Sequence, residues 1–164
     1  MLAAVAATLL VSGCQDKKKQ ARHDAMVELM HGNTPDADMA AAMEKAKSTL
    51  PEFLATMQHP GAGQSKFLVR AVFPAEGGKQ QILWINQLTY DGTLLHGVAD
   101  DNTSKKGSGI PKDGKVAVEL SKVADWMYED NGKAAGGWTL RVLRKKYPAE
   151  CEELPSLRDM QFKE

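Results

Sequence analysis

The sequence predicts an α+β protein, in which N-terminal helices and a C-terminal helix pack on a four-stranded antiparallel sheet. Three observations predict this class. Apolar residues recur at helical spacing over residues 35–58, alternate with period two in separate segments between residues 67 and 120, and return to helical spacing over residues 138–147. Because the turns between the alternating segments are too short for a crossover helix, neighbouring strands are expected to be antiparallel.

The first residues predict a lipoprotein signal peptide over residues 1–13. Residues 1–11 form an apolar run that is too short for an ordinary transmembrane helix. The run ends in a Val-Ser-Gly sequence before Cys14, which is similar to the lipobox of bacterial lipoproteins. We therefore expect cleavage before Cys14, lipidation of its thiol and anchoring in the membrane. The alternative is an uncleaved anchor or a buried helix.

The residue after the expected cleavage site predicts the location. Gln15, rather than an aspartate, follows the cysteine. This arrangement is similar to the sorting pattern of Gram-negative outer-membrane lipoproteins. The expected location is the cell envelope, at the periplasmic face of the outer membrane.

Two N-terminal helices are expected after a flexible segment. Residues 14–33 are polar and predict a tether between lipid and domain. Thr34 is expected to cap a helix over residues 35–48, where proline and aspartate occupy the first turn. A second short helix is expected over residues 51–58, because the proline at its start interrupts the first one.

The sheet is expected to follow, within a single domain over residues 34–147. Four segments have the alternation typical of strands: residues 67–73, 80–90, 93–98 and 115–120. The Asp-Gly pair at residues 91–92 is the strongest hairpin signal. Residues 121–137 predict a connecting segment, residues 138–147 a C-terminal helix that ends before a proline, and residues 148–164 an irregular tail.

Composition excludes several classes of protein. The chain has 164 residues, enough for one folded unit, and its 21 Lys plus Arg balance its 21 Asp plus Glu. Without a net positive field, no nucleic-acid partner is expected. The two cysteines, Cys14 and Cys151, have no zinc-ligand spacing, and the sequence contains neither GxGxxG nor GxxxxGK. We therefore expect no metal site and no cofactor.

A family resemblance covers about half of the chain, over residues 67–147. It is carried by Trp84, the turn at 91–92, Gly97, the turn at 113–114 before Val-Ala-Val, the Asp-Trp-Met-Tyr block at 125–128 and the Gly-Gly-Trp-Thr-Leu-Arg stretch at 136–141. With these features the chain resembles the DUF2314 family of small, exported, YegJ-like bacterial proteins, with the family core over residues 66–147. The resemblance implies no activity, because the family has none that could be carried over.

The Asp-Trp-Met-Tyr block is a candidate binding surface. Asp125, Trp126 and Tyr128 combine a carboxylate, an indole and a phenol, which are typical of recognition surfaces. The alternative is structural: Asp125 caps a turn while the two aromatic residues close one end of the sheet. Exposure of Trp126 would favour recognition, and full burial would exclude it.

Gly136 and Gly137 are a second candidate binding site. Free amides at the start of the following helix, together with Arg141, could hold a carboxylate or phosphate. The alternative is that the glycines only permit a tight turn and that the basic helix face is solvated.

Catalysis has one weak candidate, His96, within a predicted strand. No serine lies in a GxSxG sequence, and a histidine on a strand is more often a hydrogen-bonded neighbour than a base. We therefore expect a lipid-anchored periplasmic binding module rather than an enzyme, attached to the membrane through Cys14 and with a periplasmic protein as its partner. Two alternatives stay open: an immunity-type inhibitor of a periplasmic protein, and a small envelope hydrolase that uses His96 and a carboxylate.

Overall fold

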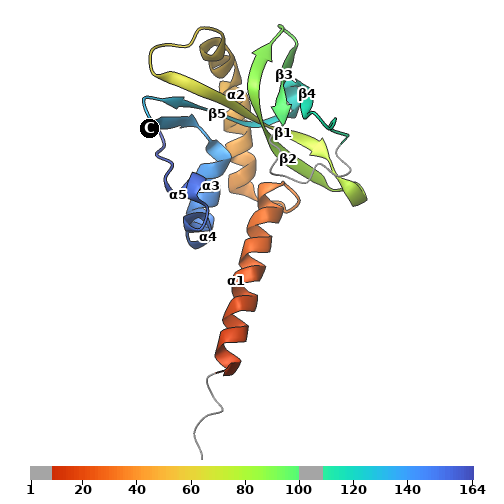
Figure 1. Ribbon diagram of the computed structural model, residues 1–164, viewed down its shortest axis with the longest axis vertical. Coiled ribbons are helices and arrows are strands. Elements are labelled where there is room, and N and C mark those ends of the chain that lie inside the picture. Colours follow the sequence, from red (N-terminus) through yellow and green to blue (C-terminus); the bar gives the residue numbers. More distant parts are fainter. Residues whose placement is uncertain (1–8, 100–108) are drawn as a thin grey trace, which may run out of the picture.

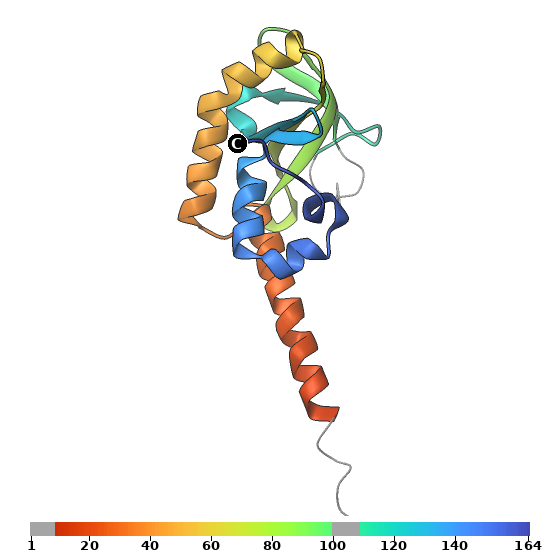
Figure 2. The ribbon, with the colours of Figure 1, turned by 90° about the vertical axis from the view of Figure 1, so that its left-hand side faces the viewer.

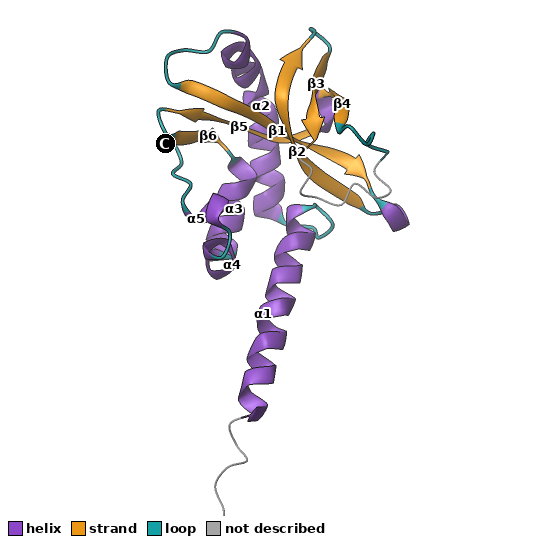
Figure 3. Ribbon diagram, in the orientation of Figure 1, coloured by secondary structure: helices purple, strands orange, loops and turns teal. Residues whose placement is uncertain are grey.

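The computed structural model describes residues 9–99 and 109–164, in which helices pack on a six-stranded antiparallel sheet (Figures 1 and 3). The predicted α+β class is confirmed. The helices are α1 (Leu9–Met30), α2 (Ala37–Gln58), α3 (Trp138–Lys146), α4 (Pro148–Glu152) and α5 (Pro155–Arg158), with short 3-10 turns at Glu76–Gly78 and Leu120–Lys122. The strands are β1 (Gln64–Pro74), β2 (Gln80–Tyr90), β3 (Leu94–Ala99), β4 (Lys115–Glu119), β5 (Val123–Asp130) and β6 (Lys133–Gly136).

The sheet has two more strands than the sequence predicts. Its strand order is β4-β3-β2-β1-β5-β6, and the predicted connecting segment over residues 121–137 contains both β5 and β6. Asn131 and Gly132 join these two strands, with φ angles of 51° and 80°. Positive φ at both positions is typical of the tight turn that Asn-Gly favours in hairpins. This pair is therefore a hairpin signal that the sequence analysis missed.

Each face of the sheet has its own hydrophobic core. Helix α2 covers one face along its length, as Figure 2 shows. Its core residues include Phe53, Val69, Ile85 and Trp126. The opposite face packs against α3, α4, α5 and the end of α1, through a cluster that includes Leu143. The middle of the two central strands, at residues 69–71 of β1 and 81–83 of β2, is therefore enclosed on both sides.

The tether predicted over residues 14–33 is wrong, because α1 is a continuous helix through residue 30. Met26 and Leu29 are 2% and 3% exposed, and they pack at helical spacing into the second core. Arg22 adds an ion pair to Glu150 of α4, with 2.5 Å between Nε and Oε1. Among the described residues, no helix is both long and apolar enough to cross a membrane.

The two predicted N-terminal helices are one helix, α2, which contains Pro51. A proline removes one backbone hydrogen bond, but burial of Leu50, Phe53 and Leu54 around it keeps the helix continuous. The cap is Asp36 rather than Thr34, because the Asp36 carboxylate accepts the N–H of Met39 at 2.9 Å.

The predicted irregular tail over residues 148–164 is also wrong. Pro148 opens α4, and α5 follows at once. Cys151 and Leu157 are 2% and 7% exposed, and Phe162 forms a bridge with Ala134 of β6. Because α1 and the tail both contribute to the second core, the folded unit extends beyond the predicted limits on both sides.

Candidate functional site

The Asp-Trp-Met-Tyr block lies on β5, between β1 and β6. Asp125 is 0% exposed and Trp126 is 6% exposed, whereas Tyr128 is half-buried. Buried side chains cannot contact a partner while the fold is intact. The prediction that Asp125 and Trp126 form a recognition surface is therefore wrong, and the structural alternative describes them.

Trp126 and Tyr128 belong to an aromatic stack under α2. Trp126 stacks on Phe53 with 5.2 Å between ring centroids, and Tyr128 stacks on Phe67 at 5.0 Å. The indole N–H of Trp126 donates to the carbonyl of Ala46 at 2.9 Å, which satisfies its polar atom inside the core. The stack fixes α2 on the sheet.

Asp125 binds the N-terminus of α3. Its Oδ2 accepts the N–H of Thr139 at 2.8 Å and the Thr139 hydroxyl at 2.5 Å. Its Oδ1 accepts the N–H groups of Trp126 at 2.8 Å and Trp138 at 3.2 Å. Free amides at a helix start attract an anion. The anion here is the chain's own carboxylate, so the predicted binding of an external anion at the two glycines is wrong.

Gly136 and Gly137 instead allow a close approach between β6, β5 and α3. Both have positive φ, at 78° and 64°. A Cβ at Gly136 would lie 2.3 Å from the carbonyl oxygen of Trp126. This distance is far below van der Waals contact, so any other residue here would clash with the backbone of β5. The tight-turn alternative is therefore the one the structure contains.

Arg141 is a packing residue rather than a ligand-binding one. Its guanidinium lies over the rings of Trp138 and Phe162, at 5.1 Å and 4.5 Å from their centroids. It also donates to the carbonyls of Gly136 at 3.1 Å and Lys163 at 2.7 Å. These contacts hold the C-terminal segment on α3.

Arg70 of β1 is a buried cation that the sequence analysis missed, and it is 1% exposed. Nη1 donates to the Thr139 hydroxyl at 2.7 Å, and Nη2 donates to the carbonyl of Met30 at the end of α1, also at 2.7 Å. The guanidinium lies 5.5 Å from the ring centroid of Trp84. Arg70, Thr139 and Asp125 therefore form one buried network that joins α1, β1, β5 and α3.

Burial dominates the electrostatics of this network. Burial raises the pKa of Asp125, although the hydrogen bonds from Thr139 and the charge of Arg70 oppose the shift. Burial lowers the pKa of Arg70 to about 10, against the attraction of Asp125, so the guanidinium stays charged at neutral pH. Burial, together with the charge of Arg70, lowers the pKa of His31, whose Nδ1 accepts the N–H of Ile82 at 3.2 Å. The network is a structural device, closed to ligands.

His96 lies elsewhere, on β3, with β2 and β1 between it and β5. Its Nε2 is 2.7 Å from Oδ2 of Asp91, and both side chains are about half exposed. Oδ1 of Asp91 accepts the N–H groups of Thr93 and Leu94 at 2.8 Å each. Chiefly the Leu94 amide, and then His96, lower the pKa of Asp91 to about 2. The structure thus brings together the histidine and a carboxylate.

The described residues place no serine beside the pair of His96 and Asp91. Ser121 donates its hydroxyl to Glu119 at 3.1 Å, and Ser104 and Ser108 lie outside the described residues. Across residues 9–99 and 109–164, no group of three or more His, Cys, Asp and Glu side chains is arranged to hold a metal ion. The contacts of His96 and Asp91 therefore stabilise the hairpin between β2 and β3, and they do not by themselves indicate a reaction.

The two cysteines lie in different parts of the fold, Cys14 near the start of α1 and Cys151 in α4. Cys14 lies within α1, and its lipidation stays a prediction, as does the signal peptide, of which residues 1–8 lie outside the described residues. Cys151 is buried in the second core, and burial raises the pKa of its thiol. A buried, protonated thiol is a poor nucleophile.

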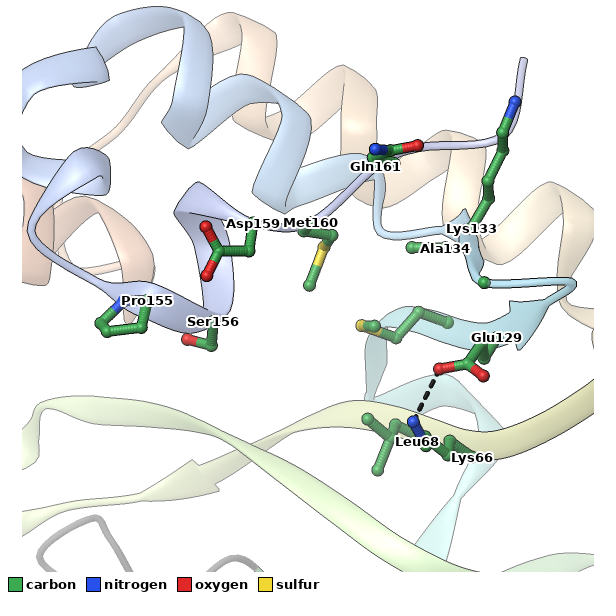
Figure 4. Close-up of a pocket in the computed structure, with 12 residues that line it drawn as sticks. Lys66, Leu68, Glu129, Lys133, Ala134, Pro155, Ser156, Asp159, Met160 and Gln161 are labelled. Atoms are coloured by element: carbon green, nitrogen blue, oxygen red, sulfur yellow. Dashed lines mark hydrogen bonds and ion pairs between the residues drawn. The ribbon is translucent and has the colours of Figure 1, made fainter.

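A candidate binding surface is an open groove between the sheet and the C-terminal segment, shown in Figure 4. It has a volume of about 300 Å³. Its apolar lining includes Leu68, Met127 and Met160, and an ion pair of 2.7 Å between Lys66 and Glu129 lies at one side. We call it the C-terminal groove. No sequence signal indicated it, because one wall belongs to the segment predicted to be irregular.

Two bacterial proteins are similar to this chain. A putative ankyrin repeat protein of Neisseria meningitidis serogroup B is 26% identical over 86 residues, which are 51% of this chain. The match covers only 34% of that protein, so the chain spans about a third of its length. The uncharacterised protein YegJ of Escherichia coli is 24% identical over 122 residues, which are 74% of this chain and 77% of YegJ.

The family comparison confirms the predicted resemblance and extends it over a longer range of residues. No solved structure matches the chain. The family described as an uncharacterised protein conserved in bacteria, DUF2314, matches residues 36–153. This range includes α2 and α4, both outside the expected family core of residues 66–147. The chain belongs to the DUF2314 family.

Proposed function

We propose that this protein is a lipid-anchored binding module, attached to the outer membrane through Cys14 and binding a protein partner in the periplasm. The observation that carries the proposal is the projection of α1 from the domain (Figures 1 and 2). Residues 16–25 of this helix are exposed, whereas Met26 and Leu29 are buried in the second core. An anchor at its start would therefore hold the domain away from the lipid surface.

The length and docking of α1 support a fixed spacer. From Cys14 to Met26 a helix rises by roughly 18 Å, at about 1.5 Å per residue. The ion pair between Arg22 and Glu150, and a second between Lys19 and Glu153 at 2.6 Å, hold the helix on α4 and on the residue that caps its end. Such a spacer would keep the C-terminal groove accessible to a periplasmic protein.

The anchor is tested by metabolic labelling with a radioactive fatty acid in the native host. We expect label in the wild type and none in Cys14→Ser. Cys151→Ser is the matched control, because it removes the other cysteine and should keep the label. Label that persists in Cys14→Ser, or that is absent from the wild type, would show that the anchor is wrong.

The partner is tested by site-specific photo-crosslinking in the same cells. A photoreactive residue at Ser156, an exposed position on the C-terminal groove, should give one discrete adduct with an envelope protein. The same residue at Ser121, which is exposed but outside the groove, should give none. Equal adducts from both positions, or none from either, would contradict binding at the groove.

A further inference from the structure

The sheet opens between β1 and β2. Their pairing ends at Val69 and Ile85. Beyond this point residues 64–68 pair with β5 alone and residues 86–90 with β3 alone, so the two strands diverge toward the top of Figure 1. In the part of the chain that the structure describes, no strand pairs with the two edges that face each other. Their inward-pointing N–H and C=O groups therefore lack a sheet partner.

A bulge lies on each side of this opening. Lys66 of β1 and Gln87 of β2 have φ angles of 54° and 52°, which residues other than glycine rarely adopt. The strand register shifts at both positions. Bulges bend and twist a strand, so a pair of them on facing edges keeps the two edges from closing into a ladder. Backbone strain of this kind is often found at binding sites.

A cavity of about 570 Å³ fills the opening, larger than the C-terminal groove. Its apolar walls are Met57, Phe67, Leu68 and Leu88. Beside them, Oδ1 of Asn86 is buried and has no hydrogen-bond partner among the described residues. A buried acceptor without a donor is costly, and an incoming N–H group would satisfy it.

We propose that an extended segment of a partner protein enters the opening between β1 and β2 and pairs with these strand edges. A polypeptide backbone is the occupant that fits, because it offers alternating donors and acceptors with the spacing of a strand. Every second side chain of the segment would be apolar and would lie against Phe67 and Leu88. The proposal rests on the proposed function only in taking the partner to be a protein.

The test uses the full-length chain in detergent micelles and a phage-displayed library of random ten-residue peptides. The selected peptides should alternate apolar and polar residues. Bound peptide should slow amide hydrogen exchange at residues 65–68 or 86–90 by at least about tenfold, because pairing protects edge amides. N-methylation of alternate peptide amides should weaken binding at least about tenfold, because it removes the donors of a strand.

The matched variants are Leu88→Arg and Leu120→Arg. Both leucines are half-buried at the rim of the same core, but only Leu88 lines the opening. Leu88→Arg should abolish peptide binding, and Leu120→Arg should keep it. Hydrogen exchange elsewhere in the sheet should be unchanged in both variants, which checks that they are folded.

Three outcomes would overturn the proposal. A library without enriched peptides would exclude strand addition. If N-methylated peptides bind equally well, the backbone does not pair with the strand edges, and the opening binds apolar side chains only. A dimer that forms without peptide and is lost in Leu88→Arg would show that a second copy occupies the opening. None of these outcomes depends on lipid at Cys14 or on crosslinking at Ser156, so this proposal and the proposed function fail separately.

Discussion

Two regions of this protein use the same local chemistry in different surroundings. In the buried region, Asp125 accepts hydrogen bonds at the start of α3, and a network connects it to the cation Arg70. In the exposed hairpin, Asp91 accepts two turn amides and contacts His96. Each region also contains a glycine with positive φ.

The two regions differ in how far water reaches their carboxylates. Asp125 is fully buried, whereas the side chain of Asp91 is 48% exposed. Water can replace the lost partners of an exposed carboxylate, but nothing replaces those of a buried one. Hydrogen-bond geometry alone therefore does not tell which carboxylate the fold depends on.

The largest expected effect is from Asp125→Ala. It removes the anion at the start of α3 and leaves Arg70 buried without a counter-charge, which should cost about 3–5 kcal/mol of unfolding free energy. Urea unfolding followed by circular dichroism measures this loss. Asp91→Ala is the exposed control and should change the midpoint far less. Equal losses would mean that burial does not separate the two regions.

The next largest difference is expected between alanine substitutions of Gly136, in the buried region, and Gly92, in the exposed hairpin. Gly136→Ala places a Cβ 2.3 Å from a backbone oxygen, whereas Gly92→Ala meets no atom within 4 Å and carries only the strain of its positive φ. We expect losses of about 2–4 kcal/mol and about 1–2 kcal/mol respectively. The same urea measurement checks both. A Gly92→Ala variant as unstable as Gly136→Ala would show that φ strain, not packing, decides.

A double-mutant cycle should show that Arg70 and Asp125 act as one network. Removing both charges with Arg70→Met and Asp125→Ala leaves no unpaired ion, so the double variant should be less destabilised than the sum of the singles by about 1–3 kcal/mol. Additive losses of stability would mean that Arg70 and Asp125 contribute independently and do not form one network. A cycle on Asp91 and His96 serves as the exposed comparison, with a smaller coupling.

The smallest expected effect is the pH dependence of the hairpin. The pKa of Asp91 is about 2 in the fold, below its ordinary value of 3.8, so the unfolded chain binds more protons between these values. Its contribution to stability is therefore present above about pH 4 and is lost as the pH falls toward 2. Urea midpoints from pH 5 to pH 2 should fall less in Asp91→Asn than in wild type. Parallel curves would contradict the shift.

Some of this architecture could be predicted from local sequence patterns. The alternation over residues 67–73 and 80–90 predicted β1 and β2, and the Asp-Gly turn predicted the hairpin to β3. The helical face over residues 138–147 predicted α3 nearly to its ends. These patterns succeed because strand and helix periodicity are properties of neighbouring residues.

The failures have a common cause as well. A short segment such as residues 14–33 lacks a broad apolar face, yet Met26 and Leu29 suffice once α3 and α4 lie beside them. Pro51 signals a helix end locally, but the packing of α2 on the sheet overrides it. Asp125 has a side chain typical of recognition surfaces, yet it lies in the core, because β5 is enclosed between β1 and β6 and the start of α3 packs on it. Each outcome depends on a contact made by residues far away in the chain.

The sequence by itself determined the α+β class, four of the strands, the last long helix and the family resemblance, because local periodicity and local motifs carry that information. The tertiary structure decided which charges are buried, which segments join the core and where the sheet opens between β1 and β2. Burial and strand pairing are set by the joint arrangement of distant segments, and no local pattern encodes that arrangement.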